Sequence, residues 1–176
     1  GLDVKGKTVV VLVNDPGFGS GDSTLFKGDQ MTYYGRWTYK YEEASRQGAQ
    51  AVFIVHETAP AAYPWGVVES SNTGTKYSLM DNNLNASELP VMGWLTLNAA
   101  EQVFASANLN YQQLKQHALS KQFQAKELNL KANLAFKNEV SHAKSHNVVA
   151  QITGSETPDE YVIISAHWDH FGTKQT

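Results

Sequence analysis

The segment Lys7-Thr-Val-Val-Val-Leu-Val13 is a run of mostly β-branched residues, which predicts a buried strand. Residues 34–47 then place apolar and aromatic side chains at helical spacing. This spacing predicts a helix over that range, and Gly48 supplies its C-terminal stop. A second apolar run, Ala51-Val-Phe-Ile-Val55, predicts another buried strand. This order of strand, helix and strand favours an α/β or α+β domain.

The middle of the chain predicts one more strand and two helices. Residues 57–88 are rich in Ser, Asn, Thr, Gly and Pro, and we interpret them as a functional loop or an insert with hairpin structure. A strand is expected over residues 89–95. Two helices should follow, each beginning at an Asn whose side chain can cap it. Asn98 would cap a helix that runs to about Ala107, and Asn110 would cap a helix over residues 111–119.

The pattern changes near residue 122, where we place a domain boundary. A half-exposed strand is expected over residues 124–137, and two further strands over 147–152 and 161–166. The predicted organisation is therefore one domain over residues 1–121 and the first strands of a second domain over 122–176.

Composition restricts the classes of function. The chain has 41% hydrophobic and 18% charged residues, as expected of an ordinary globular protein. Its net charge of −3 and scattered Lys and Arg give no electrostatic basis for binding nucleic acid. It has no Cys, so disulfides and Cys-ligated zinc are excluded. No apolar segment reaches the roughly 20 residues that a membrane-spanning helix needs.

A His-x-Asp-His cluster follows the last predicted strand. His167 and Asp169 are two residues apart, so on an extended strand their side chains leave from the same face, while His170 points to the other. Imidazole is a zinc ligand, and a neighbouring carboxylate can orient it. A structural histidine is the alternative, and these residues alone leave both open. A catalytic triad with Ser165 is disfavoured, because triad members usually come from different segments.

Two other patterns have less specific interpretations. Gly-rich residues 17–22 follow a strand, but no Lys-Ser/Thr pair comes after them, so a surface loop is favoured over a phosphate site. Aromatic residues gather at 33–37 and 62–65. They form either local core or a surface that contacts a peptide or partner domain. The candidate residues for such a substrate-access surface are Tyr34, Arg36, Trp37, Tyr63 and Trp65.

The C-terminal residues resemble the opening of the di-zinc exopeptidase family. The resemblance rests on Asn147-Val-Val-Ala, on Thr157-Pro-Asp-Glu160, and on Tyr161-Val-Ile-Ile-Ser-Ala-His-Trp-Asp-His170. Residues 3–120 resemble the protease-associated insert domain of that family, through Gly6-Lys-Thr-Val-Val and Leu89-Pro-Val among others. The resemblance implies a protease-associated domain of mixed strands with flanking helices, followed by the first strands of an α/β zinc-peptidase domain.

The same resemblance implies a zinc-dependent exopeptidase of the aminopeptidase type. His167 would be the first zinc ligand and Asp169 the carboxylate that orients it. The intact enzyme would hold two zinc ions, with the remaining ligands outside this chain, so the chain would be a fragment that is inactive alone. Its partners would be a peptide substrate and the rest of the catalytic domain. Relatives of this kind are usually exported, which implies a periplasmic or extracellular location.

An alternative function belongs to another class. Receptor-like relatives that have lost their zinc ligands act as non-catalytic protein-interaction modules. The presence of both His167 and Asp169 favours the enzyme. A bridging Asp and an adjacent Glu-Glu pair further along the protein would discriminate between the two.

Overall fold

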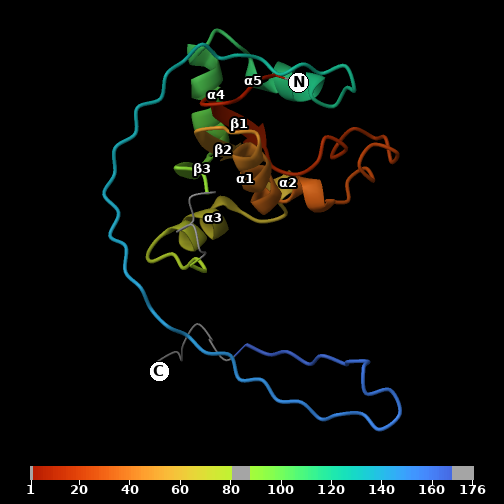
Figure 1. The fold of residues 1–176 in the computed structure, drawn as a ribbon. Coiled ribbons are helices and arrows are strands. Elements are labelled where there is room, and N and C mark those ends of the chain that lie inside the picture. Colours follow the sequence, from red (N-terminus) through yellow and green to blue (C-terminus); the bar gives the residue numbers. More distant parts are fainter. Residues whose placement is uncertain (1, 81–87, 168–176) are drawn as a thin grey trace, which may run out of the picture. The chain divides into compact units, whose positions relative to one another are not determined.

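Three short parallel strands form the centre of the fold in the computed structural model, which describes residues 2–80 and 88–167. They are β1 (Thr8–Leu12), β2 (Ala51–Val55) and β3 (Val91–Leu95), in the order β1-β2-β3 (Figure 1). All three strands predicted in this region are therefore present. Thr8 pairs with Ala51, and Ala51 pairs with Val91, so the strands start level. Their carboxyl ends consequently meet at one edge of the sheet.

One face of the sheet is covered by α1 (Trp37–Arg46). Alternate strand residues point to one side, so Val9, Val11 and Val52 pack with Ala44 of this helix. The helix predicted over 34–47 is broken into a short 3-10 turn, η1 (Tyr33–Gly35), and α1. Thr32 caps the turn, because its side chain accepts a hydrogen bond from the backbone N–H of Tyr34.

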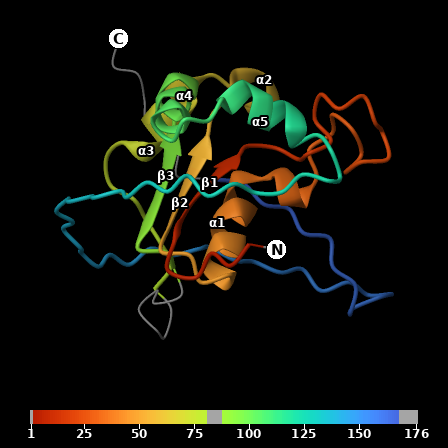
Figure 2. The ribbon, with the colours of Figure 1, turned by 90° about the horizontal axis from the view of Figure 1, so that it is seen from above.

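The opposite face is covered by α4 (Leu97–Ser106) and α5 (Tyr111–His117), as Figure 2 shows. Val55 is buried there with Ala100 and Tyr111. The predicted cap of α5 is confirmed, since the Asn110 side chain accepts from the N–H of Gln113 at 2.9 Å. The predicted cap of α4 was wrong.

The cap of α4 lies two residues earlier than the sequence pattern indicated. Thr96, the first residue after β3, accepts from the N–H of Ala99 at 3.1 Å. A Thr hydroxyl directly after a strand can end the strand and begin the helix at once, which leaves Asn98 within the first turn.

The described part of the segment between β2 and β3 contains two helices and no hairpin, which was one of its two interpretations. They are α2 (Thr58–Ala61) and α3 (Trp65–Asn72). Pro64 precedes α3 with an extended backbone, as its fixed φ favours at a helix start. Residues 81–87 of this segment lie outside the described range.

The loop between β1 and η1 is closed by hydrogen bonds to a buried carboxylate. Asp15 accepts from the N–H of Thr32 at 2.6 Å and from its hydroxyl at 3.1 Å. The N–H of Gly28 donates to the carbonyl oxygen of Leu25 at 2.9 Å. These bonds hold residues 15–32 as a compact loop without regular secondary structure.

The chain divides into two units, residues 1–134 and 135–176. The described part of the second unit, residues 135–167, contains no helix or strand and is drawn as an extended trace in Figure 1. A predicted turn is present, because the N–H of Glu160 donates to the carbonyl oxygen of Thr157 at 3.0 Å. The strands expected over 147–152 and 161–166 are not formed, nor is the one over 124–137.

The reason for the missing strands is the lack of a partner. Val162 is 94% exposed and Ile164 is 93% exposed, although both belong to an apolar run. A strand is stable only when its backbone N–H and C=O groups pair with a neighbouring strand, and no such neighbour exists among the described residues. The described chain is thus a mixed helix-and-strand fold with a small parallel sheet. Within its described residues, no helix is long and apolar enough to cross a membrane.

Candidate functional site

His167, the predicted zinc ligand, is the last residue that the structure describes, and it is exposed. Asp169, predicted to orient it, lies outside the described range, as do Trp168 and His170. Imidazole suits zinc as a donor. Among the described residues, however, no group of three His, Asp or Glu side chains could hold a metal ion. The donor chemistry therefore fits one ligand of a metal site, and the full set is not assembled within the described part of the chain.

The five residues predicted to shape substrate access form two groups. Tyr34, Arg36 and Trp37 are exposed, at η1 and the start of α1. The Tyr34 ring contacts Tyr39 edge-on, with the ring centroids 5.0 Å apart. The Trp37 ring contacts Tyr41 in the same manner at 5.6 Å. This group is an exposed aromatic surface rather than core.

Tyr63 and Trp65 form the second group, around His56 at the end of β2. Both rings contact the His56 ring, with centroids 5.7 Å and 5.6 Å away. His56 is only 4% exposed. Its Nε2 lies 3.0 Å from the carbonyl oxygen of Tyr63, and a carbonyl can only accept, so Nε2 carries the proton. His56 is thus a satisfied buried histidine that fixes the start of the segment after β2.

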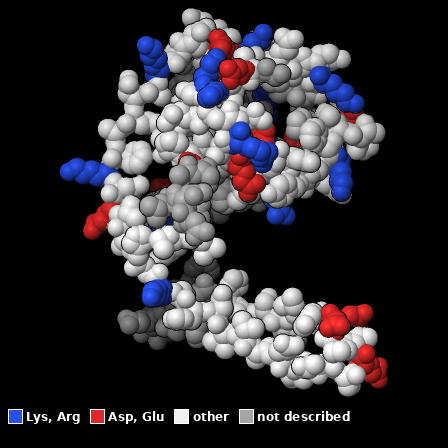
Figure 3. All heavy atoms as spheres, viewed as in Figure 1, with Lys and Arg blue, Asp and Glu red and all other residues white. Residues whose placement is uncertain are grey.

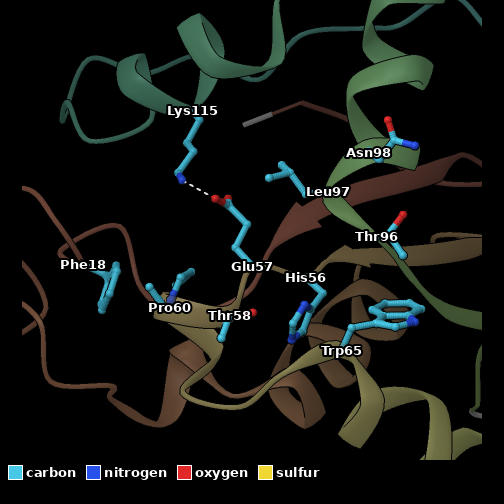
Figure 4. Close-up of a pocket in the computed structure, with 11 residues that line it drawn as sticks. Phe18, His56, Glu57, Thr58, Pro60, Trp65, Thr96, Leu97, Asn98 and Lys115 are labelled. Carbon is cyan, nitrogen blue, oxygen red and sulfur yellow. Dashed lines mark hydrogen bonds and ion pairs between the residues drawn. The ribbon is translucent and has the colours of Figure 1, made fainter.

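A pocket of about 470 Å³ opens beside this histidine (Figure 4). It lies at the carboxyl edge of the sheet, where β2 continues into Glu57 and β3 into Thr96. Its wall combines apolar groups with a pair of opposite charges. The residues that line it include Phe18, Glu57, Trp65, Leu97 and Lys115.

The opposite charges in the pocket are in direct contact. Lys115 Nζ on α5 lies 2.5 Å from Glu57 Oε2. Glu57 Oε1 accepts a second hydrogen bond from the Tyr111 hydroxyl at 2.8 Å. The side chain of Glu57 is 16% exposed and that of Lys115 is 35% exposed, so water screens this pair only in part. Burial, reinforced by the bond to Glu57, raises the pKa of Tyr111 well above its usual range.

Sequence reasoning missed this pocket. Its charged residues are 58 positions apart, and no motif joins them. One signal was available, because His56 and Glu57 directly follow a buried strand, where open α/β sheets often place polar functional groups. The partner on α5 could not be found without the packing of that helix against the sheet.

Charges elsewhere on the first unit are mixed. On the face seen in Figure 3, Lys and Arg lie among Asp and Glu rather than in a patch of one sign. Lys40 of α1 is half-buried rather than fully exposed to water. Burial lowers the pKa of its ammonium group, and the nearby Asp15 carboxylate partly offsets this shift.

Comparison with known proteins gives one family. Residues 147–175 match the model described as Peptidase family M28. No curated protein and no solved structure matches the chain. The match covers the predicted metal motif and supports a peptidase, of a family whose members are generally zinc-dependent.

Proposed function

We propose that the protein is a zinc-dependent exopeptidase of the aminopeptidase type, which hydrolyses N-terminal residues from peptides. The observation that carries this proposal is the His167-Trp-Asp-His170 motif within the residues that match a peptidase family. A peptidase as such is supported by the match. The aminopeptidase specificity, the two zinc ions and the role of the first unit are proposals.

In this proposal His167 holds one zinc ion through its imidazole. Asp169 would accept a hydrogen bond from the other ring nitrogen, which would fix the tautomer and raise the basicity of the ligand. A zinc ion held there would supply Lewis-acid chemistry for peptide hydrolysis. Further ligands and a general base would be needed to complete such a site.

The first unit is proposed to act as a protease-associated domain that shapes substrate access. Two observations support a binding surface. Tyr34 and Trp37 are exposed aromatic side chains, and Arg36 lies exposed between them. Aromatic and Arg side chains are the residue types that most often anchor a bound peptide. Tyr63 and Trp65 are half-buried, so only part of each ring is available to a ligand. An exported location, periplasmic or extracellular, completes the proposal and rests on the family resemblance.

The test is an activity assay on the intact protein. A metal-replete preparation should release N-terminal residues from a panel of peptides, lose this activity on chelation and regain it when zinc is added back. N-terminally acetylated versions of the same peptides are the matched controls and should not be cleaved. Absence of release from every peptide in the panel would contradict the proposal and favour a non-catalytic interaction module.

A further inference from the structure

We propose that the pocket at the carboxyl edge of the sheet binds a free α-amino acid with an apolar side chain. The carboxylate of Glu57 and the ammonium of Lys115 lie side by side in it, with aromatic and aliphatic groups around them (Figure 4). Every residue that lines the pocket belongs to the first unit. The inference therefore goes beyond the proposed peptidase function and does not depend on a metal centre.

The charge arrangement selects the ligand class. The two charged groups are 2.5 Å apart and sum to zero, so a ligand with one net charge would be attracted by one group and repelled by the other. An α-amino acid carries an ammonium and a carboxylate on the same carbon. Its carboxylate can approach Lys115 while its ammonium approaches Glu57, so that the four charges alternate in sign.

Both protein groups have bonding capacity for such a ligand. An ammonium has three donors, and among the described residues one donor of Lys115 is used, by Glu57. A carboxylate offers about four acceptor positions, and in the described part of the chain two on Glu57 are used, by Lys115 and Tyr111. The bond from Tyr111 holds the carboxylate in place without neutralising it. The pair is thus fixed in position and still open to a further donor and acceptor.

The apolar part of the pocket suits a hydrophobic side chain. Phe18, Trp65 and Leu97 come from three separate segments, and each is half-buried. In Figure 4, Phe18 and Trp65 lie on either side of Glu57. The volume of about 470 Å³ lies toward the small end of ligand sites, which span about 300–1,000 Å³, and it favours a single residue over a long peptide.

Calorimetric titration of the full chain with L-leucine and L-phenylalanine tests the proposal. At least one should bind saturably at one site per chain. Two derivatives of L-leucine are the informative ligands: N-acetyl-L-leucine lacks the ammonium charge, and L-leucinamide lacks the carboxylate. Each should bind at least about tenfold more weakly, because one charge-assisted contact is lost. If either derivative bound as tightly as L-leucine, the proposal would be overturned. It would also be overturned if neither amino acid bound at concentrations up to about 10 mM.

Variants locate the site. Lys115→Met should weaken binding of the amino acid at least about tenfold, because the carboxylate of the ligand loses its partner. Lys7→Met is the matched control, since Lys7 forms an ion pair with Glu127 at the same 2.5 Å but outside the pocket. It should leave binding unchanged. A dipeptide, Leu-Leu, separates the two charges by one more residue, and its binding as tightly as L-leucine would also overturn the proposal. The ligand series uses the unmodified chain, so it decides the question even if Lys115→Met fails to fold.

Discussion

Lys115 on α5 and Glu57 at the end of β2 form an ion pair with 2.5 Å between Nζ and Oε2, although 58 residues separate them in the sequence. The Tyr111 hydroxyl donates to the same carboxylate from one turn earlier on α5. Two side chains of α5 therefore bind the same carboxylate, at the edge of the sheet where the strands end. The position of this short helix depends on Glu57 as well as on the burial of Tyr111 against Val55 and Ala100.

Loss of the ammonium should destabilise the first unit. Replacing Lys115 with Met keeps the aliphatic stem but leaves a largely buried carboxylate without its counter-charge. We expect the free energy of unfolding to fall by about 1–2 kcal/mol, between the values for surface and fully buried pairs. Urea unfolding at pH 7, followed by tryptophan fluorescence, measures this change.

Lys7→Met is the control for that experiment. Its ion pair with Glu127 has the same length, but the two side chains are 49% and 51% exposed, so water screens their attraction. The loss of stability should be clearly smaller than for Lys115→Met. Equal losses for the two variants would show that burial of Glu57 contributes nothing to the strength of its pair.

Tyr41 should make the first unit sensitive to alkaline pH. Burial raises the pKa of its phenol to about 12, with a smaller contribution from Tyr63. In the unfolded chain the value is about 10. Between about pH 10 and pH 12 the unfolded state therefore loses a proton that the folded state keeps, and the free energy of unfolding falls as pH rises. This contribution to stability is complete below about pH 10.

Tyr41→Phe should flatten that alkaline decline. The cost at neutral pH should be small, because the hydrogen bond from the hydroxyl to the carbonyl oxygen of Gly93 is long, at 3.4 Å. Part of the decline should remain, since the pKa of Tyr111 is raised as well. Tyr77→Phe is the control, because Tyr77 is largely exposed and its surroundings change little on unfolding. The free energy of unfolding is measured from pH 8 to 11 for the unmodified protein and for the two variants. Identical slopes of this free energy against pH in all three would contradict the assignment.

The fold of the first unit was predictable where a single pattern determined it. The apolar run at 51–55 is a buried central strand because it fits the pleated surface between covering helices. The run at 8–12 forms the predicted strand, but it is half-buried rather than buried, because it lies at the edge of the sheet. The polar segment 57–88 was harder. Helices α2 and α3 are short, so their formation depends on tertiary packing, as in the burial of Ala61 with Ile54 of β2. The prediction of a strand at the apolar run 161–164 was wrong for a different reason. The pattern suits a strand, but no described neighbour pairs with it.

The candidate site was predictable only where its residues are close in sequence. His167 and Asp169 could be recognised because they are two residues apart, and that assignment stays a prediction. The Glu57–Lys115 pocket could not, because it requires α5 to be placed across the end of β2. The sequence shows Tyr63 and Trp65 only as aromatic residues within a polar segment. Their contact with the buried His56 ring could be known only from the packing.

Gly17 should be essential for closing the loop after β1. A Cβ added there would lie 2.1 Å from the carbonyl oxygen of Leu25 and 2.9 Å from that of Gly28, and both are backbone atoms that cannot turn away. Gly17→Ala should lower the free energy of unfolding by about 1–3 kcal/mol, as overpacking does. Thermal unfolding followed by circular dichroism gives the measurement.

Gly66 provides the matched control for that substitution. It lies in α3, and a Cβ there would meet nothing within 4 Å. Gly66→Ala should be neutral or stabilise the protein by about 0.5–1 kcal/mol, because Ala has the higher helix propensity. If Gly17→Ala were as stable as Gly66→Ala, the close packing of the loop against Leu25 would be refuted.

Zinc binding should depend on His167 and on no other histidine of the second unit. In the intact protein, His167→Ala should reduce the zinc content by up to one ion per chain at limiting zinc, because the ligand that Asp169 would orient is lost. The first unit contains none of the predicted ligands, so its thermal unfolding should be unchanged. His142→Ala is the matched control, since His142 is also exposed in the second unit but lies outside the motif. Elemental analysis of both variants after dialysis decides the question. Equal zinc content in His167→Ala and the unmodified protein would remove the basis for the metal assignment, whatever the peptidase assay shows.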